Sequence, residues 1–261
     1  MFGNESYINY DKKLITDKNL ENKLLLIMAY LRLNASYDGY VGLTLNHLIT
    51  DIGYKPDRHE GAINDQIKII LQEMIDDKSL YLIPAIKLNE LNVKQFFYIV
   101  INDEESSIFN IKKTTKYVQL SRGEYDKITK CKTKLDKARL LRIYLNIKKF
   151  VNTSDGIKEE DRVAYPSMRV ISRDCGITIG GNVDDAIKEL VKLNLIYEHV
   201  TGSYKDDKGN TKNANNVYAL SKQGISKAEE RMLDYYNVDC FYKVASPKKK
   251  QKQSIPKQKP S

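Results

Sequence analysis

The sequence lacks the features that define several large classes of protein. No apolar run approaches the roughly 18 residues that a membrane-spanning helix needs. The first residues are polar and lack the apolar stretch of a secretion signal. The few cysteines, Cys131, Cys175 and Cys240, are widely spaced and fit no zinc pattern. We therefore expect a protein of a reducing cytoplasm, with no membrane partner and no metal.

Histidine is also scarce, and its positions argue against catalysis. The histidines, His47, His59 and His199, fall in different predicted elements and show no His-Glu-x-x-His spacing. The sequence contains neither the Gly-x-x-x-x-Gly-Lys-Ser/Thr loop nor the Gly-x-Gly-x-x-Gly turn that cradle phosphates. The carboxylates are numerous but form no recognisable pair. We expect that the protein is not an enzyme and uses no cofactor.

Charge is unevenly distributed along the chain, whose 261 residues carry a net charge of +9. Residues 1–110 carry −5, residues 111–242 carry +7, and residues 243–261 carry +7. Within the middle block, residues 111–150 contain 13 basic and three acidic side chains. A localised positive field attracts polyanions, of which nucleic acid is the commonest in a cytoplasm. Attachment to a ribosome or to a membrane surface would use the same field.

Apolar spacing predicts a winged helix in the first half. Leucine and isoleucine recur at helical intervals, and Thr44 can cap the second helix. The expected elements are helices at 21–34, 43–54 and 61–80 and strands at 80–86 and 95–101. Three helices followed by two strands are the order of a winged helix.

The second half repeats this order. Ser121 and Glu124 form a capping-box pattern, and Pro166 is expected to begin a helix. The expected elements are a strand at 114–122, helices from 121 to 130, 133–151, 166–177 and 182–194, strands at 195–200 and 216–221, and a final helix at 221–237.

The predicted fold class is α+β, with two winged-helix (helix-turn-helix) domains and a disordered basic C-terminal tail. The expected boundaries are an N-terminal arm at 1–20, a first domain at 21–102, a linker at 103–115, a second domain at 116–240 and the tail at 241–261. The tail is rich in Lys, Gln, Ser and Pro, a composition that does not build a core. It is either a phosphate tether or a solubilising segment.

The stretch PSMRVISRDCGITIGGNVDDAIKELVKLNLI, residues 166–196, has the rhythm of a helix-turn-helix followed by a strand. It resembles winged-helix replication and regulatory proteins of bacterial plasmids and phages. The matching residues are Pro166, Ser167, Ile171, Ser172, Gly176, Ile177, Ala186, Ile187, Lys188, Leu190, Asn194, Leu195 and Ile196. The resemblance implies a fold more than a function, since winged helices also bind proteins. Two winged helices with a basic tail look like a replication initiator.

The predicted recognition helix departs from that family. Asp184 and Asp185 stand where its DNA-binding members usually carry Ser, Thr, Arg, Lys or Gln. An aspartate can accept a hydrogen bond from cytosine, but phosphates more often repel it. Much of any DNA affinity is therefore expected from elements around this helix.

Three elements of the second domain are candidates for DNA contacts. Small residues in the turn before 182–194 would let a phosphate approach a helix N-terminus, although a plain flexible turn is the simpler interpretation. The loop 204–215 is either a wing along phosphates or a polar hairpin. The net positive charge of residues 111–150 is larger than a solvated surface requires, which favours binding to the DNA backbone. On the helix 133–151, Lys134, Lys137 and Lys148 are expected to face solvent. The candidate residues are Lys134, Lys137, Lys148, Ser167, Arg169, Arg173, Thr178, Gly181, Asn182, Lys188, Lys205, Lys208 and Lys212.

The first domain has its own candidates, Arg58, Asn64, Gln66 and Lys68, on or before the helix at 61–80. Asn and Gln can read adenine through two hydrogen bonds. Alternatively they form the solvent face of a core helix, and an acidic half would then serve dimerisation or partner binding.

The sequence thus predicts a protein that binds double-stranded DNA with a sequence preference. It would act in replication initiation or transcription regulation of a mobile element or its host, associated with a bacterial nucleoid or plasmid. The alternative is a winged-helix adaptor between proteins of a replication or regulatory complex, with the acidic helix start as its docking face. A homodimer through Ile225, Met232, Leu233 and Tyr236, and contacts with replication or transcription proteins, stay open.

Overall fold

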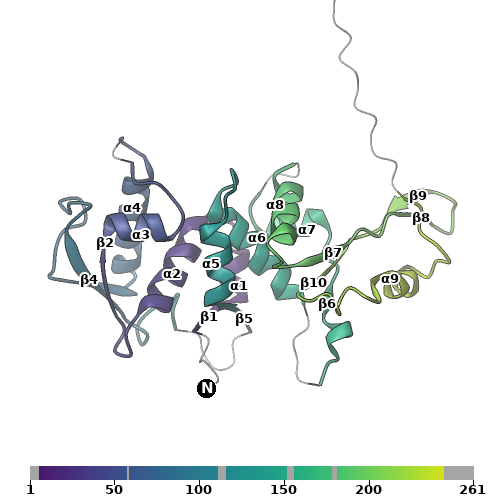
Figure 1. Cartoon of the computed structure of the whole chain (residues 1–261), viewed down its shortest axis with the longest axis horizontal. Helices are drawn as coiled ribbons and strands as arrows, with labels where there is room; N and C mark the ends of the chain where they lie inside the picture. The colour runs from purple at the N-terminus through teal and green to yellow at the C-terminus, as the bar shows by residue number, and fades with distance from the viewer. Residues whose placement is uncertain (1–5, 58, 111–115, 152–155, 178–180, 244–261) are drawn as a thin grey trace, which may run out of the picture.

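The computed structural model describes residues 6–57, 59–110, 116–151, 156–177 and 181–243 and has the expected α+β fold (Figure 1). The elements of the first half are β1 (Tyr7–Asp11), α1 (Lys12–Thr16), α2 (Asn22–Asn34), β2 (Tyr40–Thr44), α3 (Leu45–Asp51), α4 (Ile63–Asp76), β3 (Leu80–Ile83) and β4 (Phe96–Ile101). The elements of the second half are β5 (Tyr117–Ser121), α5 (Arg122–Lys130), α6 (Lys137–Phe150), η1 (Glu159–Asp161), β6 (Val163–Ala164), α7 (Met168–Asp174), α8 (Gly181–Lys192), β7 (Tyr197–His199), β8 (Ser203–Lys205), β9 (Thr211–Asn213), β10 (Val217–Ala219) and α9 (Ala228–Tyr236).

Both halves build a three-stranded antiparallel sheet in the same order. The first sheet is β2-β4-β3 and the second is β6-β10-β7. In each half a leading helix, a strand, two helices and two further strands follow one another, which is the order of a winged helix. The strands β2 and β6 were not predicted, because each is short and follows a polar loop.

The two halves are joined through their leading strands. β1 pairs with β5 in antiparallel register, centred on Asn9 opposite Gln119. The helices that follow, α2 and α6, pack against each other between the two sheets (Figure 1). The two halves therefore meet through equivalent elements, β1 with β5 and α2 with α6.

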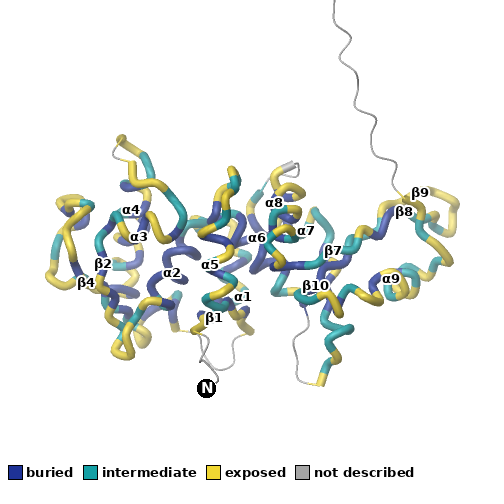
Figure 2. Tube along the Cα trace, viewed as in Figure 1, coloured by how far each residue is buried: buried dark blue, intermediate teal, exposed yellow. Residues whose placement is uncertain are grey.

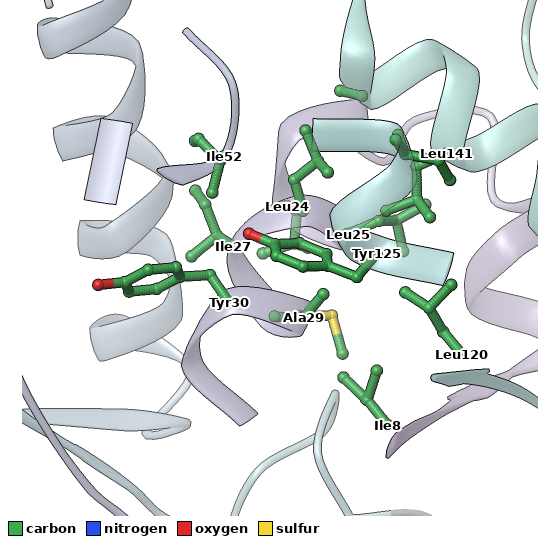
Figure 3. Close-up of a cluster of buried hydrophobic side chains, with 14 of the residues drawn as sticks. Ile8, Leu24, Leu25, Ile27, Ala29, Tyr30, Ile52, Leu120, Tyr125 and Leu141 are labelled. Atoms are coloured by element: carbon green, nitrogen blue, oxygen red, sulfur yellow. The ribbon is translucent and has the colours of Figure 1, made fainter. Parts of the chain in front are cut away.

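One hydrophobic core runs through both halves. Figure 3 shows Ile8 of β1, Leu25 of α2, Leu120 of β5 and Leu141 of α6 in one cluster. The buried positions form a continuous band along the middle of the molecule (Figure 2). The halves therefore share a core, whereas the sequence predicted two domains separated by a linker.

The expected N-terminal arm at 1–20 is wrong, because residues 7–16 belong to this core. Ile8, Tyr10 and Ile15 are buried. The Tyr10 hydroxyl donates to the Leu25 carbonyl oxygen at 2.7 Å. Of the expected linker 103–115, residues 111–115 lie outside the described residues, while Ser106 and Phe109 are buried.

Short polar side chains fix where several helices begin. Thr44 accepts a hydrogen bond from the His47 amide, and Ser121 and Glu124 form the predicted capping box. Ser167 caps α7 by accepting from the Val170 amide. Pro166 therefore precedes the cap residue and does not begin the helix as predicted.

The second half carries two additions. A hairpin, β8–β9, is inserted between β7 and β10, and we call residues 203–213 the wing. The helix α9 packs on the outer face of the second sheet, where Ala228 and Met232 contact a small cluster with Val163, Val217 and Ala219. The apolar residues proposed for a dimer, Ile225, Met232 and Tyr236, thus pack within the chain. No helix in the described ranges is both long and apolar enough to cross a membrane.

Candidate nucleic-acid interface

Several loops and helix ends lie along one edge of the molecule. In Figure 1 the N-terminal ends of α4 and α8 and the loop between α5 and α6 all lie along the upper edge. The wing lies at the right-hand end of the same view. We define the loop edge as residues 55–57, 59–62, 131–136 and 181–185. It contains the turn before α4, the loop between α5 and α6 and the first residues of α8.

The lysines of the 131–136 loop are free. Lys132 and Lys134 are exposed and make no ion pair within the described ranges. The adjacent Lys130 instead binds Asp126 at 2.9 Å, one turn back on α5. Lys134 thus keeps the solvent-facing position expected of it, and Lys132 adds a second free cation beside it. Lys132 belongs to the basic segment 111–150 but was not among the residues predicted to contact DNA.

Lys137 was wrongly expected to face solvent. Only 7% of the residue is exposed, and its Nζ donates to the carbonyl oxygens of Ile128 at 3.3 Å and Thr129 at 3.2 Å. These carbonyls end α5 and have no partner within that helix. The ammonium also lies at the negative end of the helix dipole. Lys137 therefore holds the α5–α6 corner together and is unavailable to a phosphate.

Lys148 is likewise committed inside the protein. Its Nζ lies 2.6 Å from Glu124 Oε1, and 15% of its side chain is exposed. The neighbouring Lys149 binds Asp174 at 2.9 Å across to α7. The expectation that Lys148 faces solvent is therefore wrong. Two of the 13 basic residues at 111–150, Lys148 and Lys149, thus pair with carboxylates inside the protein.

Arg142 is the clearest case of an internal cation. It is 1% exposed, and its guanidinium donates to the carbonyl oxygens of Ile15 at 3.1 Å and Leu20 at 3.0 Å, and to that of Asp17. It also donates to Asn22 Oδ1 at 2.9 Å. These acceptors end α1 and begin α2. Arg142 of the second half thus fixes the α1–α2 corner of the first.

The start of α8 is acidic, as the sequence indicated. Gly181 is its first residue, and Asn182, Asp184 and Asp185 are exposed. Asp184 binds Lys188 at 2.5 Å, one turn along the helix. Lys188 is therefore partly neutralised, whereas Asp185 has no ion pair among the described residues. Thr178 lies outside the described residues.

The residues of α7 show mixed roles. The Ser167 side chain is engaged as the cap of the helix. Arg169 is exposed. Arg173 keeps 61% of its side chain exposed but donates to Asp174 Oδ1 through Nε at 3.0 Å and Nη2 at 2.9 Å. Arg169 is the freer of the two arginines.

The wing presents two free lysines and one paired lysine. Lys205 and Lys208 are exposed, and the described part of the chain offers neither an ion pair. Lys212 binds Asp206 at 2.9 Å. The hydrogen bond from Lys212, with those from Asn210, lowers the pKa of Asp206 to about 2. Asp206 therefore stays ionised and organises the hairpin turn.

The first-half candidates separate into buried and exposed residues. Asn64 is 4% exposed, and its Oδ1 accepts from the Asp57 amide at 3.0 Å, so its expected role as a base reader is wrong. Gln66 is exposed and donates to the Gly61 carbonyl oxygen at 2.8 Å. Lys68 is half-buried and donates to the Leu91 carbonyl oxygen at 3.0 Å. Arg58 lies outside the described residues.

The described residues bring together no group of three or more histidine, cysteine or carboxylate side chains that could hold a metal ion. His47 lies in α3, His59 in the turn before α4 and His199 in β7. The loop edge and the wing present exposed lysine ammonium groups and amide side chains. Such groups can contact an anionic phosphate backbone.

Comparison with known proteins finds distant structural similarity. No family model matches the chain, and no curated protein matches it significantly. A solved structure described as "Crystal structure of Pi initiator protein in complex with iteron DNA" is 12% identical. The alignment covers 82% of this chain and 96% of that one, with a TM-score of 0.41.

Proposed function

We propose that this protein binds double-stranded DNA along the loop edge. The observation that carries the proposal is the repeated helix pair. The pairs α3–α4 and α7–α8 each bring the N-terminal end of their second helix to the same edge, with the free Lys132 and Lys134 between them (Figure 1). A duplex presents phosphates continuously along its length. Lysines and helix ends that lie along one edge of the protein can therefore contact a single stretch of DNA.

We expect different residues to contact the phosphates and the bases. Lys132, Lys134 and Arg169, with the wing lysines, supply contacts to phosphates that set position and affinity. Exposed amides at the helix starts, Asn182 on α8 and Gln66 on α4, are the candidates for base contacts. The carboxylates of Asp184 and Asp185 would repel phosphates, so Asn182 at the start of α8 is the residue of this helix expected to reach a base edge.

A role in replication initiation or in transcription regulation of a mobile element is the finer part of this proposal. It rests on the resemblance of residues 166–196 to plasmid and phage proteins. We further expect no catalysis, since the loop edge combines cations and amides without a nucleophile paired to a base.

The alternative is a protein adaptor, and one observation favours it. The outer face of the β2-β4-β3 sheet exposes Tyr40, Tyr81, Phe96 and Tyr98, each by 44–55%. Aromatic clusters of this kind are enriched at protein interfaces. The face belongs to the acidic half, so a protein partner or a second copy of the chain suits it better than DNA.

Fluorescence anisotropy across a salt series, with random and genomic AT-rich duplexes, tests the proposal. The double variant Lys132→Gln/Lys134→Gln is compared with Lys222→Gln, an exposed lysine near Gly224, which packs against Glu159 and Arg162. We expect the double variant to lower the salt slope by up to about 1.8, since each phosphate contact contributes about 0.9. Equal slopes in all three proteins would show that the loop edge does not contact DNA.

A further inference from the structure

The wing is separate from the second sheet. Among the described strands, β8 and β9 pair with each other in a two-stranded sheet, whereas β7 and β10, which flank them in sequence, belong to the sheet β6-β10-β7. In Figure 1 the wing projects beyond that sheet at the right-hand end of the molecule. A two-stranded hairpin alone is at best marginally stable in water. The direction of the wing therefore depends on the contacts at its base.

The chain after α9 returns to the base of the wing. Ser203 donates its amide to the Tyr242 carbonyl oxygen at 2.9 Å, and Tyr242 donates its amide to the Ser203 carbonyl oxygen at 2.7 Å. Ser203 uses its own N–H and C=O groups in this bridge, so Tyr242 and β9 lie on opposite sides of β8. Residues 241–243, expected to belong to the tail at 241–261, are therefore part of the folded protein, while residues 244–261 lie outside the described residues.

Gly202 permits this close approach. A Cβ atom at this position would lie 2.4 Å from the Tyr242 carbonyl oxygen, and the backbone φ is +104°. Both the space and the backbone conformation exclude an ordinary side chain. The glycine is thus required for Tyr242 to pair with Ser203.

Aromatic rings hold the same junction from the side of α9. The ring of Tyr204 in β8 lies 4.6 Å from that of Tyr236 in α9, and Phe241 lies 6.0 Å from Tyr236. The Tyr236 hydroxyl accepts from the Asn215 amide at 3.0 Å, just beyond β9. Tyr236 and Phe241 also pack against the small cluster on the outer face of the second sheet. We call Tyr236, Phe241 and Tyr242 the clasp, since they join the wing to that sheet.

The lysines that depend on the clasp are Lys205 and Lys208. Lys205 directly follows Tyr204 in β8, and the Lys208 amide donates to Asp206 Oδ1 at 3.0 Å in the hairpin turn. Because the hairpin is bonded internally, the direction of β8 sets where both ammonium groups lie. A segment that is already ordered loses less conformational freedom on binding than one that must be ordered by its ligand.

We propose that the clasp fixes the direction of the wing, so that its members are positioning residues for the contacts of Lys205 and Lys208 with the phosphodiester backbone of a duplex. The clasp acts through these two lysines. Its effect on affinity comes from ordering the wing before DNA arrives. This inference rests on the proposed function, since the loop edge must place the duplex within reach of the wing.

A double-mutant cycle on the full chain tests this dependence. We expect Phe241→Ala to weaken duplex binding about fivefold, because the released wing must then be ordered on binding. The pair Lys205→Gln/Lys208→Gln should lower the salt slope by up to about 1.8. In that background, Phe241→Ala should weaken binding little further. Tyr37→Ala, which removes a fully exposed ring from the first half, is the control and should leave affinity unchanged in both backgrounds.

A second variant keeps the clasp side chains and every lysine. Gly202→Ala opposes the Tyr242 bridge through the backbone, and we expect it to weaken binding in the same way as Phe241→Ala. Hydrogen exchange of the free protein, followed by mass spectrometry, measures the wing itself. We expect exchange at 203–213 to become faster in both variants, while exchange in α6 stays as it is.

The possible results separate this inference from the proposed function. Equal weakening by Phe241→Ala in both backgrounds would show that the clasp does not act through the wing lysines, and would refute the inference alone. A lower salt slope for the lysine pair, with full affinity in Phe241→Ala and Gly202→Ala, would show that the wing needs no clasp. If neither the wing lysines nor Lys132 and Lys134 alter the salt slope, the proposed function fails as well.

Discussion

The two halves have the same order of elements but use their central helices differently. The helix α2 of the first half is buried from Leu24 to Leu33 except at Arg32, and its buried side chains are apolar apart from one tyrosine hydroxyl. The helix α6 of the second half buries Lys137, Arg142 and Asn146 as well. The cations of α6 bind corners of both halves. The difference shows that basic residues counted along the sequence include some that bind groups inside the protein and are not available to a ligand at the surface.

The outer faces of the two sheets also differ, because a described helix covers only one of them. In the second half, α9 covers Val163, Val217 and Ala219. In the first half, no described helix covers the matching face, which exposes Tyr40, Phe96 and Tyr98. The second half thus covers the outer face of its own sheet with a helix, whereas the outer face of the first sheet exposes aromatic side chains.

Removing Arg142 should have the largest effect. We expect Arg142→Met to lower the free energy of unfolding by roughly 3 kcal/mol or more, because buried carbonyl oxygens at the α1–α2 corner lose a charged donor. Ile27 holds the same position in α2, counted from the cap residues Glu21 and Asp136. Ile27→Val should cost about 1 kcal/mol. Urea unfolding followed by circular dichroism compares them, and equal losses would mean that Arg142 does not join the halves.

Lys137 and Lys134 should separate stability from binding. We expect Lys137→Met to cost about 2 kcal/mol, because the last carbonyl groups of α5 lose their donor. Lys134→Gln, three residues earlier and exposed, should leave stability within about 0.5 kcal/mol and weaken DNA binding. Urea unfolding and anisotropy on both variants measure the contrast. The reverse pattern would contradict the assignment of Lys137 to the fold.

The fold was more predictable than the site. Caps such as Ser121 with Glu124 are local patterns, and the sequence located them. The strand β1 was missed because its partner, β5, lies far along the chain and no local pattern marks the pairing. Lys134 and Lys137 look alike in sequence, and only the position of the α5 carbonyl groups makes one free and the other buried. Asn64 was misassigned because the polar turn that binds it has no helical periodicity.

The Lys149–Asp174 pair should make stability depend on pH. Burial raises the pKa of Asp174, but hydrogen bonds from Lys149 and Arg173 outweigh it and leave the pKa below its ordinary value. Because the pKa of Asp174 is lower in the folded than in the unfolded chain, its ionised carboxylate stabilises the fold at pH values above the unfolded pKa. This stabilisation is lost as the pH falls below about 4. We expect Asp174→Asn to cost about 1–2 kcal/mol at pH 7 and less towards pH 3. Urea unfolding at each pH measures the difference, and a constant difference for Asp174→Asn would refute the linkage.

Neutralising Asp185 should have the smallest effect, and it should act on binding alone. We expect Asp185→Asn to tighten DNA binding about threefold, because one exposed charge near phosphates disappears. Asp234→Asn on α9, also exposed, serves as the matched control in anisotropy titrations. A comparable gain from Asp65→Asn on α4 would indicate that both halves face the duplex equally. No gain from Asp185→Asn would place the start of α8 away from DNA.

The pairing of β1 with β5 sets the order in which the chain can fold during synthesis. Tyr7 cannot meet Ser121 until the ribosome has made nearly half of the polypeptide. The face of α2 that packs against α6 also stays uncovered until residues 137–150 are made, so the newly made first half is incomplete. Contacts between such distant residues form slowly, since a long loop must close first. The shared core therefore makes the two halves mature together, and the first half depends on the second before either can act.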